Sequence, residues 1–469
     1  MKEFRIKGMR WFLEDEGMAD VLERLPESAD TRRHYTVVPY KDGKIFIKTF
    51  VEKGAIGALR NRTVPRGRKE YETGKRLASM SIRTPECLGY GIGRKRSSVI
   101  LHWIEGESFV HIFLCQGLSK DLISGLAGLL RKLKENGVCH NDLHLDNVLV
   151  SGGELYLIDL HKATIKRALS DNDELSNLTH ALTMIYKDLG EEEKRRFFEL
   201  YGNTGIQRGV EEEIRQLRRK WIESKKRRAF QETSKIIRKG ERLYVAGMED
   251  HGKGAYVGTL KSDKKVRVER YSDHIRKIYK GKRRLERAWK NHIVLLYLNA
   301  GIIPEAYYVK LPSLFSDGFI AMEDLGSRGR ELDRYLDGSY DGFDMARRRR
   351  FIEDFSGFIK RVTGLSIMHS DMKGCNFFVV NDNDFFFLDV EDIVFDAADE
   401  AALQRALVQL NNTIPKRISA RDRLRFFARL ARSLNVDRKR LLKNVIGESL
   451  KGEIVYEGVA GLMREKWNS

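Results

Sequence analysis

Apolar residues recur at helical spacing in two segments that lie far apart in the chain. Each segment has six apolar positions separated by steps of one and three residues, which is the pattern of one buried face of an amphipathic helix. The two sets keep a constant separation of 229 positions, and both segments are therefore predicted to be buried helices in the same register. The first set is Leu122, Ile123, Leu126, Leu129, Leu130 and Leu133, and the second is Phe351, Ile352, Phe355, Phe358, Ile359 and Val362.

Other features repeat with the same separation. The alternating segment IFIKTF (45–50) predicts a strand that carries Lys48, and Lys277 follows 229 positions later in HIRKIYK (274–280). The triplet RFF at 196–198 returns at 425–427. A repeat this long indicates a duplicated domain instead of a solenoid. We therefore expect an α+β chain of two modules, 1–235 and 236–469, with the boundary somewhere between 205 and 265.

A polar phrase follows each predicted helix, HNDLHLDN (140–147) in the first module and HSDMKGCN (369–376) in the second. Phosphoryl transfer from a nucleotide needs a carboxylate near the acceptor hydroxyl, oxygen ligands for magnesium and a cation for the phosphates. Asp142 and Asp371 are the candidate catalytic bases. Asn147 and Asn376 follow them at a spacing that allows an amide oxygen to reach a metal ion from the same loop.

An aspartate then ends an apolar strand in each module. Asp159 closes ELYLIDL and Asp389 closes FFFLDV, and a carboxylate in that place suits the main magnesium ligand. Lys48 and Lys277 are the candidate phosphate-binding cations. In the first module a helix glutamate is expected to orient the lysine, and Glu70 is our choice, with Glu72 as its rival.

The second module differs in two places. Lys373, two residues after Asp371, is a candidate for stabilising charge on the transferred phosphoryl group, where the first module has the titratable His144. Asn291 aligns with Glu70, which leaves Glu286 as the nearest acidic substitute on that helix, or no substitute at all. We expect His140 and His369 to be structural, hydrogen-bonded to the loop backbone.

Composition limits the class of protein, its compartment and its possible partners. The chain has 469 residues with 42% hydrophobic and 33% charged residues, as is typical of folded domains, and it shows no apolar run long enough to span a bilayer. Its four cysteines are far apart with no Cys-x-x-Cys, and a cytoplasmic protein is expected. The formal charge of +19 favours a polyanionic partner. We do not expect nucleic acid, because no recognisable nucleic-acid module accompanies the charge.

At these residues the sequence resembles the protein-kinase-like superfamily, and within it the lipopolysaccharide kinases that phosphorylate core heptose or the inner octulosonic acid. HNDLHLDNVLV and HSDMKGCNFFV are similar to that family's catalytic loops, and LYLIDLHKA and FFFLDVEDI to its metal-binding strand ends. The resemblance implies tandem bilobal kinase-like domains, each with an antiparallel-sheet N-lobe and a helical C-lobe. It also implies ATP, Mg²⁺ and an anionic glycolipid substrate, reached by a peripheral protein at the cytoplasmic face of the membrane.

Two other interpretations stay open at this point. The chain could be a small-molecule or protein kinase of the same superfamily, because the acceptor pocket is not visible in the sequence. It could also be a scaffold in which one or both modules are pseudokinases, since the second module lacks a clear helix glutamate and neither module has a G-x-G-x-x-G loop before its lysine.

Overall fold

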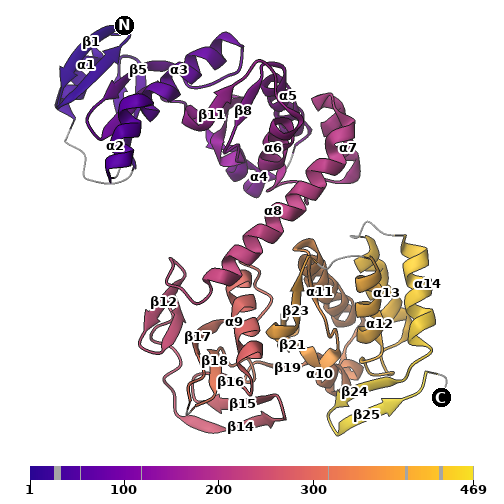
Figure 1. The fold of residues 1–469 in the computed structure, drawn as a ribbon. Helices are drawn as coiled ribbons and strands as arrows, with labels where there is room; N and C mark the ends of the chain where they lie inside the picture. The colour runs from indigo at the N-terminus through magenta and orange to yellow at the C-terminus, as the bar shows by residue number, and fades with distance from the viewer. Residues whose placement is uncertain are drawn as a thin grey trace. The chain divides into compact units, whose positions relative to one another are not determined.

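The computed structural model describes residues 1–25, 33–52, 54–117, 119–314, 316–396, 400–432 and 437–467. The chain divides into two compact units, Met1–Gln216 and Leu217–Ser469, and the division falls within one long helix, α8 (Gln207–Arg228). Each unit mixes helices and antiparallel strands (Figure 1).

The first unit begins with a sheet of six antiparallel strands in the order β1-β2-β5-β6-β4-β3. Lys48 lies on β4, which is an inner strand paired with β3 and β6, so its backbone position is fixed from both sides. The elements of this half are β1 (Lys2–Ile6), β2 (Met9–Leu13), α1 (Met18–Arg24), β3 (Arg33–Tyr40), β4 (Gly43–Val51), α2 (Gly54–Thr63), α3 (Arg66–Ser79), β5 (Cys87–Ile92) and β6 (Arg96–His102).

Helix α3 packs against β5 and β6 of this sheet. The approach is close at Gly67, where an added Cβ would lie 2.3 Å from the carbonyl oxygen of Ser98, so only glycine fits. The Gly67 N–H donates to Ser97 Oγ at 3.2 Å, which ties the start of the helix to the strand. This packing places Glu70, one turn further along, over the sheet near Lys48.

The rest of the first unit is mainly helical. Its elements are β7 (Glu107–Ser108), α4 (Phe109–Gln116), α5 (Lys120–Glu135), β8 (Val138–His140), η1 (Leu145–Asn147), β9 (Val148–Ser151), β10 (Glu154–Leu157), η2 (Leu160–Lys162), β11 (Ala163–Ile165), α6 (Asp171–Leu182), α7 (Glu191–Tyr201) and η3 (Thr204–Ile206). The predicted helix through residues 122–133 is present as α5. Five of its six predicted core residues are buried, and Leu122 is half-buried against the same core.

The second unit begins with a sheet of seven antiparallel strands in the order β12-β13-β17-β18-β16-β15-β14, and Lys277 lies on the inner strand β16. The segment 245–260, which the sequence could not assign to either module, contributes to this sheet. The elements are β12 (Ile236–Lys239), β13 (Arg242–Val245), β14 (Tyr256–Ser262), β15 (Val266–Tyr271), β16 (Ile275–Tyr279), α9 (Lys282–Tyr297), β17 (Ala306–Lys310) and β18 (Gly318–Met322).

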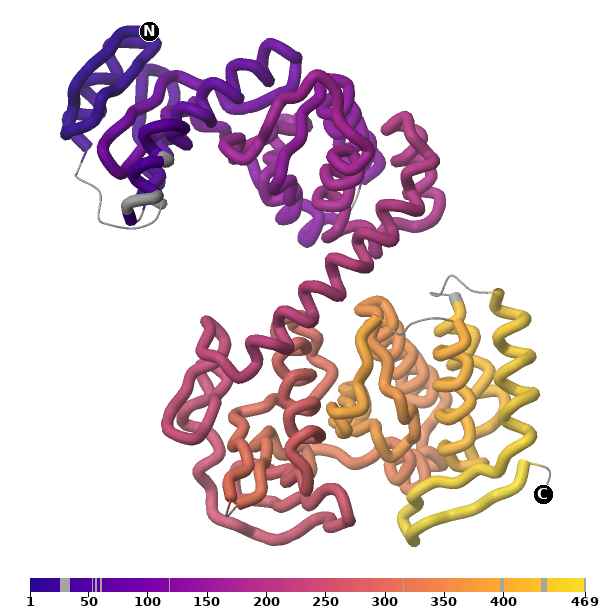
Figure 2. The backbone as a smooth tube through the Cα atoms, viewed as in Figure 1, coloured from indigo at the N-terminus to yellow at the C-terminus, as the bar shows by residue number. Residues whose placement is uncertain are grey.

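A helical half follows in the second unit as well. Its elements are β19 (Gly329–Glu331), α10 (Leu332–Ser339), η4 (Tyr340–Gly342), α11 (Met345–Gly364), β20 (Ile367–His369), η5 (Gly374–Asn376), β21 (Phe377–Val380), β22 (Asp384–Phe387), η6 (Val390–Asp392), β23 (Ile393–Phe395), α12 (Glu400–Asn411), α13 (Ala420–Arg432), α14 (Arg438–Ser449), β24 (Ile454–Gly458) and β25 (Gly461–Glu465). Helix α11 buries all six residues of the predicted apolar face. The C-terminal hairpin β24–β25 lies beside α10 (Figure 2).

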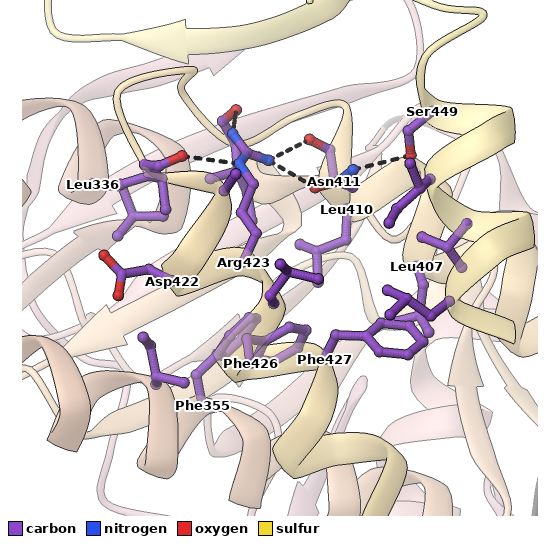
Figure 3. A pocket seen from close by; sticks show the side chains of 18 of the residues that line it. Leu336, Phe355, Leu407, Leu410, Asn411, Asp422, Arg423, Phe426, Phe427 and Ser449 are labelled. Carbon is purple, nitrogen blue, oxygen red and sulfur yellow. Dashed lines mark hydrogen bonds between the residues drawn. The ribbon is translucent and has the colours of Figure 1, made fainter. Parts of the chain in front are cut away.

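A cavity of about 300 Å³ lies among the helices of the second unit, lined mainly by aliphatic and aromatic side chains of α10–α14. Arg423 closes part of the cavity wall, because its guanidinium donates to the carbonyl oxygen of Asn411 at 2.9 Å (Figure 3). It also donates to the carbonyl oxygens of Ile414 and Pro415 at 2.9 and 2.8 Å. Lys277, Asp371 and Asp389 are not among the residues that line the cavity.

Candidate active site

In the first unit, β4, α3 and the end of β10 bring three of the predicted residues together. Lys48 Nζ donates to both carboxylate oxygens of Glu70 at 2.9 Å and also to Asp159. Lys48 is 5% exposed and Glu70 is 1% exposed, so the ion pair is shielded from water. A lysine held in this way presents its ammonium group in a fixed position, as a phosphate-binding cation requires. Glu72, the rival choice, is exposed and pairs with Arg68 instead.

His161 also belongs to this cluster, and the sequence analysis missed it. Its Nδ1 lies 2.9 Å from Asp159 Oδ1 and 3.6 Å from Glu70 Oε2. Burial opposes charge on this ring, but hydrogen bonds with the two carboxylates raise the pKa of His161 above its usual value. Burial would likewise raise the pKa of Asp159, yet the contacts with His161 and Lys48 hold that pKa well below its usual range. Asp159 adopts a left-handed backbone conformation (φ 61°), which is uncommon outside functional sites and turns.

The loop from β8 to η1 carries Asp142 and Asn147. Asn147 Nδ2 donates to the carbonyl oxygen of Asp142 at 2.8 Å, and the Ile158 N–H donates to the carbonyl oxygen of Asn147 at 2.9 Å. The second bond joins the loop to the strand end that carries Asp159. Since the amide nitrogen of Asn147 is committed to Asp142, its amide oxygen is the atom that can bind a cation.

Two basic side chains contact Asp142. Lys162, from η2, donates to its carboxylate, and His144 Nε2 lies 3.2 Å from Asp142 Oδ1. Burial acts to raise the pKa of Asp142, but the hydrogen bond and charge of Lys162 lower it below its usual value. Lys162 was not predicted; the only sequence signal for it is a basic residue three positions after the strand-end aspartate.

The second unit assembles the same kinds of residue. Lys277 Nζ donates to Asp389 Oδ1 at 2.6 Å, and Asn376 Nδ2 donates to the carbonyl oxygen of Asp371 at 2.7 Å. The Leu388 N–H donates to the carbonyl oxygen of Asn376 at 3.0 Å, as Ile158 does to Asn147 in the first unit. Lys373 Nζ lies 3.0 Å from Asp371 Oδ1, so its charge is available beside the candidate base.

Both phrase histidines are buried and hydrogen-bond the loop backbone, as expected. The Asp142 N–H donates to His140 Nδ1 at 3.3 Å, and the Asp371 N–H donates to His369 Nδ1 at 3.2 Å. His369 Nε2 also contacts the carbonyl oxygen of Asp389 at 2.9 Å. Burial lowers the pKa of both rings, so neither is suited to be charged near neutral pH.

The donor set in each unit fits Mg²⁺, which prefers carboxylate and amide oxygens. Asn147 with Asp159 in the first unit, and Asn376 with Asp389 in the second, would hold the ion. Glu70, Asp159 and His161 also lie close enough together to ligate a metal. Glu70 and Asp159 are both bonded to Lys48, however, so this group forms an ion-pair network around the lysine.

Comparison with known proteins gives a family for the first unit. Residues 21–201 match the lipopolysaccharide kinase (Kdo/WaaP) family model, and Lys48, Glu70, Asp142, Asn147 and Asp159 all lie within the match. The family expected from the sequence is thereby confirmed over residues 21–201, and the expectation of a kinase is confirmed for the same stretch. Residues 217–469 lie outside the matched range.

Solved structures give weaker likenesses. The chain is similar to WaaP in complex with acyl carrier protein, with 18% identity and a TM-score of 0.36 over 45% of this chain and 98% of the other. It is also similar to WbdD in a co-crystal structure with a kinase inhibitor, with 16% identity and a TM-score of 0.27 over 39% of this chain and 45% of the other. These scores are too low to bear on the fold. No curated protein matches.

Proposed function

We propose that the chain is an ATP- and Mg²⁺-dependent phosphotransferase that acts on a sugar hydroxyl of the lipopolysaccharide core, a heptose or octulosonic acid. The observation that carries the proposal is the same constellation in each unit: a buried lysine paired with the strand-end aspartate, beside a loop aspartate and asparagine. We also propose that the units are two kinase-like domains, each with a sheet lobe and a helical lobe.

Each residue has a distinct role in this proposal. The lysine holds the nucleotide phosphates, and the asparagine and strand-end aspartate hold Mg²⁺, which neutralises phosphate charge when it is bound. Asp142 or Asp371 orients the acceptor hydroxyl and takes its proton as the oxygen bonds to the γ-phosphorus and ADP leaves. Lys162 and Lys373, beside the two bases, supply positive charge near the phosphoryl group that is transferred.

The substrate class rests on the family match and on charge. The formal charge of +19 suits an anionic glycolipid, because each Lys or Arg near an anionic membrane surface contributes about 1 kcal/mol of attraction. Within the described part of the chain, no helix is both long and apolar enough to cross a bilayer. We therefore propose that the protein reaches its substrate peripherally, from the cytoplasmic face.

Purified protein tests this function directly when ATP consumption is measured with and without lipopolysaccharide core. The expected result is ADP release that depends on the core and on Mg²⁺ and is lost in the double variant Asp142→Ala, Asp371→Ala. Core-dependent activity that survives in the double variant would falsify the assignment of both aspartates. Activity on a small molecule or peptide but not on the core favours the other kinases of this superfamily.

A further inference from the structure

Lys277 has two carboxylate partners in the second unit, and one of them was not anticipated. Besides Asp389, its Nζ donates to Glu391 Oε2 at 3.0 Å, and the Tyr279 hydroxyl donates to the same oxygen at 3.2 Å. Glu391 lies on η6, two residues beyond the strand-end aspartate, and is only 2% exposed. A carboxylate that is buried this deeply needs a fixed cation, and Lys277 provides it.

Helix α9 supplies no comparable acid. Asn291, which aligns with Glu70, donates to the carbonyl oxygens of Val390 and Ile393 at 2.8 and 2.9 Å and so anchors the helix to η6. Glu286 is partly exposed and lies 4.0 and 3.7 Å from Lys282 and Lys290 on its own helix. Asn291 therefore has an anchoring role, and Glu286 is occupied elsewhere.

In each unit a helix contacts the segment that follows the strand-end aspartate, α3 in the first unit and α9 in the second. The acidic and basic sides of this contact are exchanged between the two units. In the first unit the helix is acidic, with Glu70, and the segment is basic, with His161 at the second position after Asp159. In the second unit Glu391 takes the second position after Asp389, and the helix is basic: Arg284 Nη1 lies 3.9 Å from Glu391 Oε1.

The charge is also reversed at the third position. Lys162 of the first unit contacts Asp142 of the loop, whereas Asp392 stands in its place in the second unit and accepts from Arg287 of α9 at 3.1 Å. The acid beside the lysine therefore lies on the helix in the first unit and on the segment in the second. The basic residues lie on the segment in the first unit and on the helix in the second. Both arrangements leave one buried carboxylate beside the lysine.

We propose that Glu391 is the positioning residue that orients Lys277 toward the nucleotide phosphates, in the place that Glu70 has for Lys48, and that the second unit is a working nucleotide site. This rests on the proposed function. Asp389 would hold the metal ion, and Glu391 would then still hold the Lys277 ammonium group in place for the phosphates. Without Glu391 the lysine would retain only the partner that the metal ion also needs.

In the full chain, Asp142→Asn removes the candidate base of the first site, so the remaining ATP turnover reports on the second site. In this parent, Glu391→Gln is expected to lower kcat/KM for Mg-ATP about 100-fold, as for a misplaced binding group. Glu286→Gln, the matched control on α9, is expected to stay within about twofold of the parent. Glu391→Asp keeps the charge but shortens its reach, and an intermediate loss is expected. Calorimetric binding of Mg-ATP and thermal melting are measured for every variant.

The outcomes separate the two claims. A parent that binds Mg-ATP and consumes ATP, but responds equally to Glu391→Gln and Glu286→Gln, overturns the role of Glu391 alone. A parent that consumes no ATP, where the wild type does, overturns the working second site. If Glu391→Gln melts far below the parent, Glu391→Asp decides: reduced activity at an unchanged melting temperature supports positioning, and full activity contradicts it.

Discussion

Lys48 Nζ lies 2.9 Å from both carboxylate oxygens of Glu70, and both side chains are almost fully buried. Glu70→Gln keeps the shape of the side chain but removes the charge that fixes the lysine. With Asp371→Asn silencing the second site, we expect Glu70→Gln to lower kcat/KM for Mg-ATP about 100-fold. Glu72→Gln, on the same helix but exposed and paired with Arg68, is the control and should leave the rate unchanged. Equal effects of the two substitutions would show that the buried pair has no special role.

Lys162 donates to Asp142 in the first unit, and Lys373 lies beside Asp371 in the second. If these lysines stabilise the transferred phosphoryl group, Lys162→Ala with Asp371→Asn and Lys373→Ala with Asp142→Asn should each lower kcat about 100-fold, with KM for ATP nearly unchanged. Lys166→Ala is a matched control, because Lys166 pairs with Asp173 away from the loop. A rise in KM without a fall in kcat would instead place the lysines in ground-state binding.

Asp333, at the start of α10, predicts a pH dependence of stability. It is 1% exposed, and burial raises its pKa from 3.8 to about 6 despite hydrogen bonds from the N–H groups of Glu457 and Arg334. The folded protein therefore keeps this proton up to about pH 6, whereas the unfolded chain releases it near pH 3.8. The contribution of this group to stability is full below pH 3.8 and is lost as the pH rises through 6.

Urea unfolding of wild type and Asp333→Asn between pH 4 and 7.5 measures this effect. The unfolding free energy of wild type relative to the variant should fall by roughly 2–3 kcal/mol across this range, because a shift of one pKa unit corresponds to about 1.4 kcal/mol. The variant cancels contributions from the other titrating groups. A difference that is constant, or that rises with pH, would contradict the raised pKa of Asp333.

Gly67 tests whether close packing of α3 on β6 positions Glu70. A Cβ at this position would lie 2.3 Å from the carbonyl oxygen of Ser98, so Gly67→Ala must push the helix away from the sheet. We expect a loss of about 1–3 kcal/mol in stability, together with reduced activity of the first site. Gly128→Ala on α5 is the control, since a Cβ there meets nothing within 4 Å and alanine favours the helix by about 1 kcal/mol. Melting temperatures that move equally in both variants would oppose this view.

Local pattern was enough to locate much of the candidate site. The strand with Lys48 and the loop with Asp142 were placed from hydrophobic alternation and motif spacing, and Glu70 was chosen over Glu72 as the expected helix glutamate. The structure brings Lys48, Glu70 and Asp159 into contact. Hydrophobic periodicity and motif spacing describe one segment of the chain at a time. They predict a site residue when its own segment carries a recognisable pattern.

Glu391 could not be predicted from such local patterns, for two physical reasons. Its role depends on a contact with a lysine 114 positions away, which no local pattern reports. The separation of 229 positions also changes to 230 between Asn376 and Asp389, so the segment that carries Glu391 does not align with the first module by the offset found elsewhere. Lys162 was missed because its partner Asp142 lies 20 positions earlier, on a different loop.

Mass spectrometry of the glycolipid core tests the central claim most directly. Core oligosaccharide is compared from cells that carry the wild-type chain, Asp142→Asn, Asp371→Asn or both substitutions. With two working sites, each single variant should lack part of the core phosphate that the wild type adds, and the double variant should lack all of it. Full phosphorylation of the core in cells that carry only the double variant would contradict the account.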